Sequence, residues 1–407
     1  MKRLVLAGLL LLGGRVRADD RGDAHAALQL YVQPAPGDTL VVITPSASAH
    51  VNATGWLAFD AEWLADVVTG ATPRTYGPAD VISAATQFSE TRNLVGVAAE
   101  ATWRMLTLLG GYSFGNESDY RSHLLRANLK ADLLQHNTVL AASYSHGFDS
   151  VCNLANQESL AVTLRQPLDR STGCFSGNPQ LTEESVGIDS AELSWVQTLS
   201  PRWAGTLVGS YQHLSGFQSN PYRTVRLSGG LFLAQESHPR VRDRGAVTAR
   251  VRYAIAEVHG TLGFDLRLYR DTWGIQSLTG EASYEQPFRQ ARPAWRFGVR
   301  ARGYVQSGAI FFRDVTAADS YDRSGPVGSF FTADQALAPL ADLLLGARAT
   351  WAGYKATRYW RAFTDMDASV LVNWTKVFAL TPDPPNVART QGWASAILLG
   401  LSASGRF

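Results

Sequence analysis

Residues 393–407, WASAILLGLSASGRF, end the sequence with its clearest β-strand pattern. Successive side chains of a strand point to opposite sides, so alternate residues share one face. One face of this stretch carries Trp393, Ser395, Ile397, Leu399, Leu401, Ala403, Gly405 and Phe407. The pattern predicts a strand that has one mostly apolar face and ends on an aromatic residue.

The same alternation recurs along most of the chain. Between Leu57 and Val67, for example, an apolar face alternates with a face that carries acidic residues. Such segments predict about sixteen strands, an even number, as single-chain bacterial membrane barrels have. The predicted strands cover residues 26–33, 40–51, 56–68, 91–104, 105–116, 123–134, 137–148, 188–198, 202–214, 243–256, 259–271, 276–286, 295–307, 340–351, 366–378 and 393–407.

The composition of the apolar faces favours a membrane barrel over a soluble β-sandwich. Apolar residues make up 45% of the chain and aromatic residues 10%. A sandwich core needs bulky residues throughout, whereas many of these faces are half alanine, glycine or valine, with Trp or Tyr near the strand ends. Such faces are typical of a lipid-facing wall with aromatic girdles. The expected fold is therefore all-β: a single transmembrane antiparallel β-barrel of about 16 strands.

Connection lengths agree with this fold. If the first strand runs outward, every long connection but one falls on the extracellular side, and short periplasmic turns join the strands at the other end, as is typical of such barrels. The expected extracellular loops are 69–90, 149–187, 215–242, 308–339 and 379–392. The expected turns are Asn52–Gly55, Gln135–Asn137, Leu199–Pro201 and Glu257–Val258. The exception is the periplasmic connection 352–365, which is too long for a tight turn.

The first residues indicate export. Lys2 and Arg3 precede an apolar stretch, and Val16 and Ala18 occupy the small-residue positions of a signal-peptidase site. That stretch is too short to span a bilayer, and no other segment reaches the roughly 18 apolar residues of a transmembrane helix. We expect residues 1–18 to be a cleaved secretory signal peptide and residues 19–407 to form one outer-membrane β-barrel.

The terminal aromatic residue, Phe407, is similar to the assembly signal of bacterial outer-membrane barrels, which the barrel-assembly machinery reads. The expected location is therefore the bacterial outer membrane. Its lipids and the assembly machinery are the expected partners. The near balance of 37 basic and 35 acidic residues gives no indication of nucleic-acid binding.

Three short runs resemble a known bacterial family. They are Ser219–Arg223 (SNPYR), Glu236–Arg242 (ESHPRVR) and Tyr269–Ile275 (YRDTWGI), and Gly70-Ala71-Thr72-Pro73 is similar too. The family is uncharacterised and is known only as a domain of unknown function, family 3570. The resemblance implies a secretion signal and a barrel. It implies no activity, because none is established for the family.

Charged residues gather on the predicted inner face of several strands. On the tenth strand, Arg250 and Arg252 continue a row that begins at Arg240, Arg242 and Arg244. The other candidate lumen-lining residues are Asp60, Glu62, Asp66, Asp265, Arg267, Glu281, Glu285, Arg296, Arg300 and Arg302. They either pair across neighbouring strands in a watery interior or line a pathway that selects polar or ionic solutes. The arginine row has too few predicted partners for pairing alone.

The remaining chemistry is sparse. Cys152 and Cys174 lie in one predicted loop, and outside the cytoplasm such a pair usually forms a disulfide. A two-cysteine metal site is the alternative, but His146 is the only nearby histidine. His238 is interpreted as a residue that orders its loop rather than as a general base. The sequence contains no recognisable nucleophile motif, metal cluster or phosphate loop, so we expect neither an enzyme nor a cofactor.

These observations predict a porin-like channel for small polar or anionic solutes. The alternative is a non-enzymatic barrel scaffold or conduit shell that anchors a periplasmic or surface partner.

Overall fold

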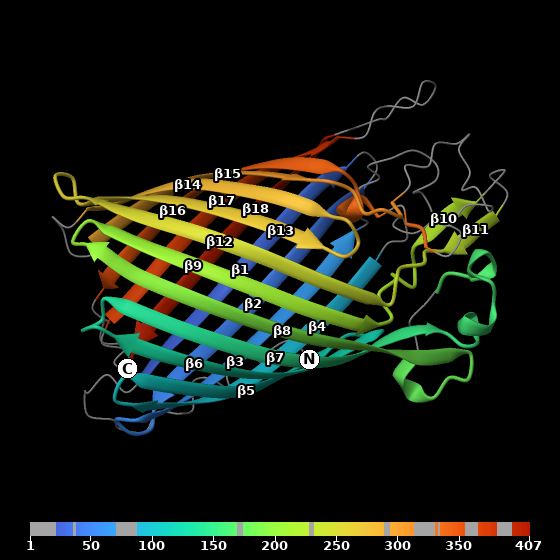
Figure 1. The fold of residues 1–407 in the computed structure, drawn as a ribbon, viewed down its shortest axis with the longest axis horizontal. Coiled ribbons are helices and arrows are strands. Elements are labelled where there is room, and N and C mark those ends of the chain that lie inside the picture. The colour runs from blue at the N-terminus through green and yellow to red at the C-terminus, as the bar shows by residue number, and fades with distance from the viewer. Residues whose placement is uncertain are drawn as a thin grey trace.

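In the computed structural model the chain forms a closed antiparallel β-barrel of sixteen strands (Figure 1). The structure describes residues 22–35, 38–70, 88–168, 174–227, 232–288, 294–312, 330–332, 334–354, 365–380 and 393–407. The predicted signal peptide lies outside these residues. No helix within the described ranges is long and apolar enough to cross a bilayer.

Each of the sixteen predicted strands corresponds to one strand of the barrel. They are β1 Gly22–Ala35, β2 Asp38–Asn52, β3 Leu57–Gly70, β4 Phe88–Trp103, β5 Leu106–Asn116, β6 Tyr120–Leu133, β7 Thr138–Leu154, β8 Leu181–Ser200, β9 Trp203–Gly216, β12 Val241–Ile255, β13 Gly260–Asp271, β14 Gln276–Phe288, β15 Ala294–Gln306, β16 Leu340–Tyr354, β17 Asp365–Ala379 and β18 Trp393–Arg406. Two short strands, β10 Thr224–Leu227 and β11 Phe232–Gln235, were not predicted and form a separate hairpin.

The largest difference from the predicted boundaries is at β7 and β8. Both strands run several residues beyond the predicted ends, and Asp149–Leu154 of β7 pair with Leu181–Val186 of β8. The reason is that the hairpin continues past the rim of the barrel, where no lipid-facing alternation marks it in the sequence.

Closure joins the first strand to the last. β1 pairs with β18 over ten residues, from Asp23 opposite Arg406 to Val32 opposite Ile397. The Gly22 amide donates to the Phe407 carbonyl at 3.1 Å, and the Phe407 amide donates to the Gly22 carbonyl at 3.0 Å. Phe407 therefore belongs to the hydrogen-bonded seam. Its role as an assembly signal stays a prediction.

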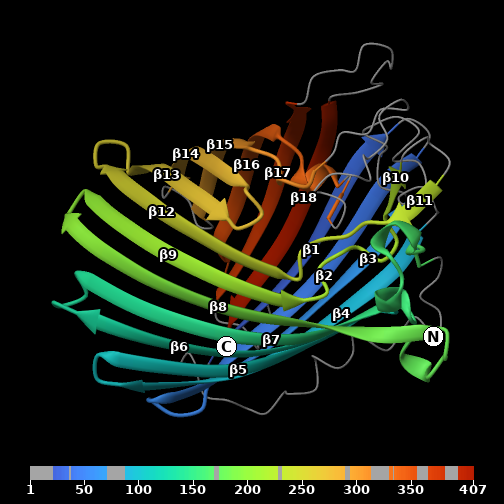
Figure 2. The same ribbon diagram turned by 45° about the vertical axis from the view of Figure 1, so that its right-hand side comes forward.

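Turns and loops segregate to opposite ends of the barrel. The turns 53–56, 104–105, 134–137, 201–202 and 256–259 lie at the end where β18 finishes (Figure 1). The hairpin β10–β11 and the short 3-10 helices of residues 157–176 lie beyond the other end (Figure 2). Within the described residues the clusters of buried apolar side chains also lie at this loop end.

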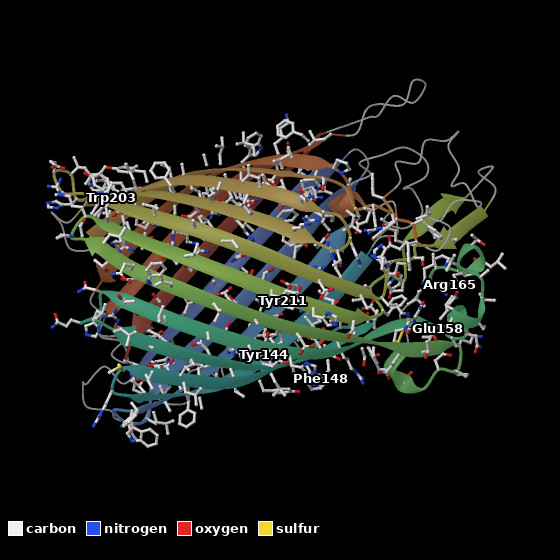
Figure 3. The ribbon with its side chains drawn as sticks, in the orientation of Figure 1. Tyr144, Phe148, Glu158, Arg165, Trp203 and Tyr211 are labelled. Carbon is white, nitrogen blue, oxygen red and sulfur yellow. A yellow bond between two sulfur atoms is a disulfide. The ribbon has the colours of Figure 1, made fainter. Side chains whose placement is uncertain are left out.

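The outer wall is apolar. Large apolar side chains such as Leu193, Leu266 and Val299 are exposed there. Trp203 lies near the turn end, whereas Tyr211 lies farther along the same strand (Figure 3). Tyr144 on β7 lies at a similar position along the barrel axis. Exposed tryptophans 56, 103, 295 and 351 accompany Trp203 at the turn end. Aromatic rings at two levels with aliphatic residues between them are the girdles of a transmembrane barrel.

A polar row interrupts this outer wall near the loop end. His146 on β7 is paired in register with Asp189 on β8, Asp189 with His213 on β9, and His213 with Asp243 on β12. Each aspartate accepts hydrogen bonds from its own Tyr-x-His pair. Asp189 lies 2.6 Å from the Tyr144 hydroxyl and 2.8 Å from His146 Nδ1, and Asp243 has the same contacts, at the same distances, with Tyr211 and His213. The row therefore satisfies its own polar atoms on an otherwise apolar surface.

The assignment of inner and outer faces can be tested by introducing arginine at one outward-facing and one inward-facing position. Leu266 faces outward in the middle of β13, so Leu266→Arg should destabilise the folded barrel by about 2–4 kcal/mol, the cost of an arginine facing the bilayer midplane. Ser194→Arg puts the same side chain on the inner face of β8 and should cost less than about 1 kcal/mol. Urea titration of protein folded in vesicles, followed by the faster gel migration of unboiled barrel, measures both. Equal costs would refute the assignment.

Candidate functional site: the charged inner wall and the mouth of the barrel

The predicted lumen-lining residues lie on the inner face. Val247 on β12 and Leu266 on β13 are half exposed on the outside, and residues of opposite parity therefore point inward. This places Arg250 and Arg252 on the inner face of β12, and Asp265 and Arg267 on that of β13. The same rule, applied to the exposed residues of each strand, turns Asp60, Glu62, Asp66, Glu281, Glu285, Arg296, Arg300 and Arg302 inward.

Asp265, at the centre of β13, contacts two arginines of β12. Both oxygens of Asp265 accept from the Arg252 guanidinium, one of them at 3.1 Å from Nη2. Arg250 Nε lies 3.7 Å from the same carboxylate. The side chains of Arg250 and Arg252 are 50% and 41% exposed although they point into the barrel. They therefore border open space rather than a packed core.

Farther around the wall, pairing is incomplete. Arg302 is opposite Glu281 in register, yet its guanidinium lies 3.3 Å from Asp342 on β16 instead. Within the described residues, several inward charges have no ion pair within 4 Å: Arg267, Glu281, Glu285, Arg296 and Arg300.

The acidic row on β3 has three separate sets of contacts. Asp60 lies 2.8 Å from His50 Nδ1, and Asp66 accepts from the Thr44 hydroxyl at 2.6 Å. Glu62 reaches Arg126 on β6 at 3.2 Å, across the two intervening strands β4 and β5.

Two glycines make this long reach possible. A Cβ added to Gly96 on β4 would lie 2.4 Å from the Glu62 carboxylate, and a Cβ on Gly111 of β5 would lie 2.8 Å from Arg126 Nε. The two charged side chains lie flat against the wall because these positions have no side chain. The lumen stays wider there than the length of the side chains alone would allow.

Opposite signs of charge dominate different parts of the inner wall. In Figure 1, β14 and β15 of one part lie at the top and β5–β7 of the other lie at the bottom. We call the inner face of β12–β16 the basic wall. It carries Arg242, Arg244, Arg250, Arg252, Arg267, Arg296, Arg300, Arg302 and Arg348 against Asp265, Asp271, Glu281, Glu285 and Asp342. We call the inner face of β3–β8 the acidic wall. Its described charges are Asp60, Glu62, Asp66, Glu100, Asp132, Asp149, Glu184 and Glu192 against Arg92, Arg126 and Lys130.

A polar cavity of about 550 Å³ lies where the two walls meet, between β5 and β13. One register row across it runs Arg126, Ser145, Ser190, Gln212 and Arg244. The next row runs Asn128, Ser143, Glu192, Ser210, Ala246 and Tyr269. In the first row Arg244 donates to Gln212 at 3.0 Å, and Gln212 donates to the Ser190 hydroxyl at 3.0 Å. The residues at the centre of the cavity have short side chains, most of them serine hydroxyls, and longer charged side chains border them.

Three loops join into one cap at the mouth. The Gln235 amide of β11 donates to the Arg165 carbonyl at 2.9 Å, which ties hairpin β10–β11 to the loop between β7 and β8 (Figure 3). Ser237 pairs with Phe331, which ties the same segment to the connection between β15 and β16. Six strands, β8, β9, β12, β13, β14 and β15, lie between the first and the last of these loops. The cap therefore spans the mouth rather than following the rim.

Inward-facing residues of the rim are buried beneath this cap. Asn153 of β7 accepts from Gln235 at 2.9 Å, and Gln306 of β15 donates to the Ala338 carbonyl at 2.7 Å. Arg242 of β12 binds Asp271 of β13, and its guanidinium lies 4.0 Å from the centre of the Trp273 ring. These contacts come from the inner face, so the cap sits inside the wall and narrows the mouth.

The family-like runs meet in the cap. Glu236 is fully buried: it accepts from the Asn220 amide at 2.7 Å and the Thr332 hydroxyl at 2.8 Å, and Arg223 lies 3.7 Å away. His238 Nε2 lies 3.4 Å from Glu236, and Nδ1 lies 2.9 Å from the Gln218 carbonyl. Burial alone would raise the pKa of Glu236, but His238, Arg223 and the Asn220 amide outweigh it and hold the pKa below its usual value. His238 contacts the cap on two sides, as its interpretation as a loop-ordering residue requires.

The disulfide prediction is confirmed. Cys152, at the end of β7, is bonded to Cys174, and both are buried against Leu168. The bridge fastens the loop between β7 and β8 to the base of the cap.

Sequence reasoning underestimated the partners of the arginine row. Arg240 binds Glu158 and lies 3.4 Å from Glu184, and Arg242 binds Asp271. The three carboxylates come from a loop, the extended part of β8 and the end of β13. Only the folded loops bring them together, so strand alternation alone could not assign them. Among the described residues no group of three His, Cys, Asp or Glu side chains could hold a metal ion.

The model of the family described as "Protein of unknown function (DUF3570)" matches residues 83–352. No curated protein matches the sequence. Among solved structures, a bacterial polysaccharide outer membrane secretin is 10% identical, with 96% of this chain and 100% of that chain covered and a TM-score of 0.49. OpdK of Pseudomonas aeruginosa with vanillate is 8% identical, with coverage of 95% and 99% and a TM-score of 0.43. OccD3 (OpdP) of the same organism is 9% identical, with coverage of 95% and 91% and a TM-score of 0.42.

The bridge between Cys152 and Cys174 should protect the cap. Thiol labelling of unreduced protein should modify neither cysteine. Replacing both by serine should leave the barrel assembled but expose residues 155–168 to protease, because a loop-closing disulfide contributes about 2–4 kcal/mol. Two labelled thiols in the unreduced protein would contradict the bridge.

Acid should loosen the cap through Glu236. A carboxyl whose pKa is lowered by folding contributes stability that is complete above its unfolded pKa, roughly 4.3, and is lost as the pH falls through the folded value. Hydrogen exchange at residues 232–240, corrected for the intrinsic rate, should therefore accelerate below about pH 4. Glu236→Gln should loosen the cap already at pH 7 and flatten this dependence. Glu257→Gln, at an exposed carboxylate of a turn at the opposite end of the barrel, is the control and should leave the dependence intact.

Proposed function

We propose that this chain, which belongs to the DUF3570 family, is a bacterial outer-membrane channel through which small polar or anionic solutes cross. One observation carries the proposal: half-exposed charged side chains, Arg250 and Arg252 among them, line the inside of a closed barrel whose outside is apolar. An apolar exterior with aromatic girdles needs a bilayer, and sixteen strands leave room for an aqueous lumen.

The two faces of the barrel wall determine the partners that we propose. Outer-membrane lipids cover the apolar exterior, and Phe407 at the seam is the contact for the assembly machinery. The transported solutes meet the inner charges, and no catalytic step is part of the proposal.

The basic wall supports a modest preference for anions. Its arginines outnumber its carboxylates, and Arg267, Arg296 and Arg300 have no ion pair in the described part of the chain. Glu281 and Glu285 lie among them, and salt screens charges beyond about 10 Å at 0.1 M, so the preference should be small.

The cap supports a second candidate. Loops that fold inside the mouth and bury Arg242, Asp271 and Gln306 could equally close a shell that anchors a periplasmic or surface partner. Ion conductance separates the two candidates, because a closed shell conducts nothing.

Charge reversal on β12 tests the channel. Arg250→Glu with Arg252→Glu should turn the modest anion preference into a cation preference, because the variant removes two arginines from this wall and adds two carboxylates beside Asp265. The measurement is the reversal potential across a planar bilayer under a salt gradient. Arg104→Glu with Arg202→Glu, in two turns outside the lumen, makes the same change in net charge and should leave the potential unaltered. An unchanged potential in the folded β12 variant would remove these arginines from the pathway. A wild-type barrel that conducts nothing would favour the shell.

A further inference from the structure

The cavity between β5 and β13 is lined by charges of both signs that have no ion pair among the described residues. Glu192 is exposed in the middle of its row, with Ser143 and Ser210 on either side. Arg267 is exposed on β13 and also lines the cavity. Neither has an ion pair within 4 Å among the described residues. An unpaired carboxylate and an unpaired guanidinium bordering one cavity are free to bind a ligand.

The spacing of these groups fits a small dipolar molecule. Arg244 lies two strands from Glu192 and two residues along the sheet towards the loop end, and Arg267 lies three strands away and two residues towards the turn end, which separates their backbones from that of Glu192 by about 12–16 Å. All three side chains line the cavity, and Ser210 and Ala246, which follow Glu192 in its row, have short side chains that leave the space between them open. The remaining gap suits a ligand with an ammonium group at one end and a carboxylate at the other.

The signs of charge exclude simpler ligands. A plain anion attracted by Arg244 and Arg267 meets the carboxylate of Glu192, and a plain cation attracted by Glu192 meets the arginines. A molecule with both charges satisfies both ends. Arginine also provides two parallel donors that match a carboxylate, and the serine hydroxyls can bond a peptide group between the ends.

The whole lumen has the same polarity as the cavity. The acidic wall and the basic wall place opposite charges on different sides of the bore, so the field between them crosses the pathway. A dipolar solute lowers its energy by turning along that field, whereas a neutral solute of equal size gains nothing. This argument from the walls is independent of the contacts inside the cavity.

We propose that the lumen is selective for zwitterions, namely amino acids and short peptides, and binds them with the ammonium group at Glu192 and the carboxylate at Arg244 and Arg267. The inference rests on the proposed channel function and names its class of solute.

Four related compounds test it in planar bilayers, by the concentration at which each reduces the potassium chloride current. Glycylglycine has both charges, N-acetylglycine only the carboxylate, glycinamide only the ammonium group, and N-acetylglycinamide neither. Glycylglycine should bind most tightly, by about two- to fivefold for each ionic contact, the range of a partly exposed ion pair. Glu192→Gln should reduce its affinity to that of N-acetylglycine. Arg244→Gln with Arg267→Gln should reduce it to that of glycinamide.

Matched controls lie on the same walls outside the cavity. Glu100→Gln on β4 and Arg348→Gln on β16 remove inward charges of the same kind and should keep the ranking of the four compounds. Every variant is first shown to be folded by its faster migration when unboiled. Equal block by all four compounds, or a ranking that survives Glu192→Gln and the double arginine variant, would overturn the inference while ion conductance keeps the channel. A wild-type barrel without conductance would overturn both.

Discussion

A backbone inside a bilayer has no water to bond, so every amide and carbonyl must find a partner within the protein. In this chain the seam between β1 and β18 meets that requirement, with Gly22 and Phe407 bonded at its end. Closure removes the last free strand edge and forces alternate side chains to lipid or to the lumen. The apolar outside and the charged inside follow from that one requirement.

The wall could be predicted from the sequence because its signals are local. Alternation within about ten residues identifies a strand, and the parity of an apolar residue such as Leu266 fixes the direction of its neighbours Asp265 and Arg267. Hairpin connections then set which strands are adjacent. The inward direction of Arg250 and Arg252 was predictable on these grounds, and so was the bridge between two cysteines of one loop.

The cap and the detailed pairing could not be predicted, because contacts between loops have no period. Arg240 meets a loop carboxylate, and buried Glu236 draws partners from segments far apart in the chain. Arg302 is opposite Glu281 in register but contacts Asp342 on β16 instead, so Glu281 has no ion pair among the described residues. The polar row on the outside is only partly visible in the sequence. Tyr144-Ser145-His146 and Tyr211-Gln212-His213 repeat one Tyr-x-His pattern, but the aspartates that they contact lie on other strands.

Gly96 and Gly111 affect how the interior of such a barrel can change in evolution. Because Glu62 and Arg126 lie across them, the width of the barrel interior at that level depends on two residues that carry no charge. A side chain at either position would push the ion pair away from the wall and narrow the interior, although every charged residue is retained. Related barrels with the same pattern of charges can therefore differ in the width of their interior through their glycines alone.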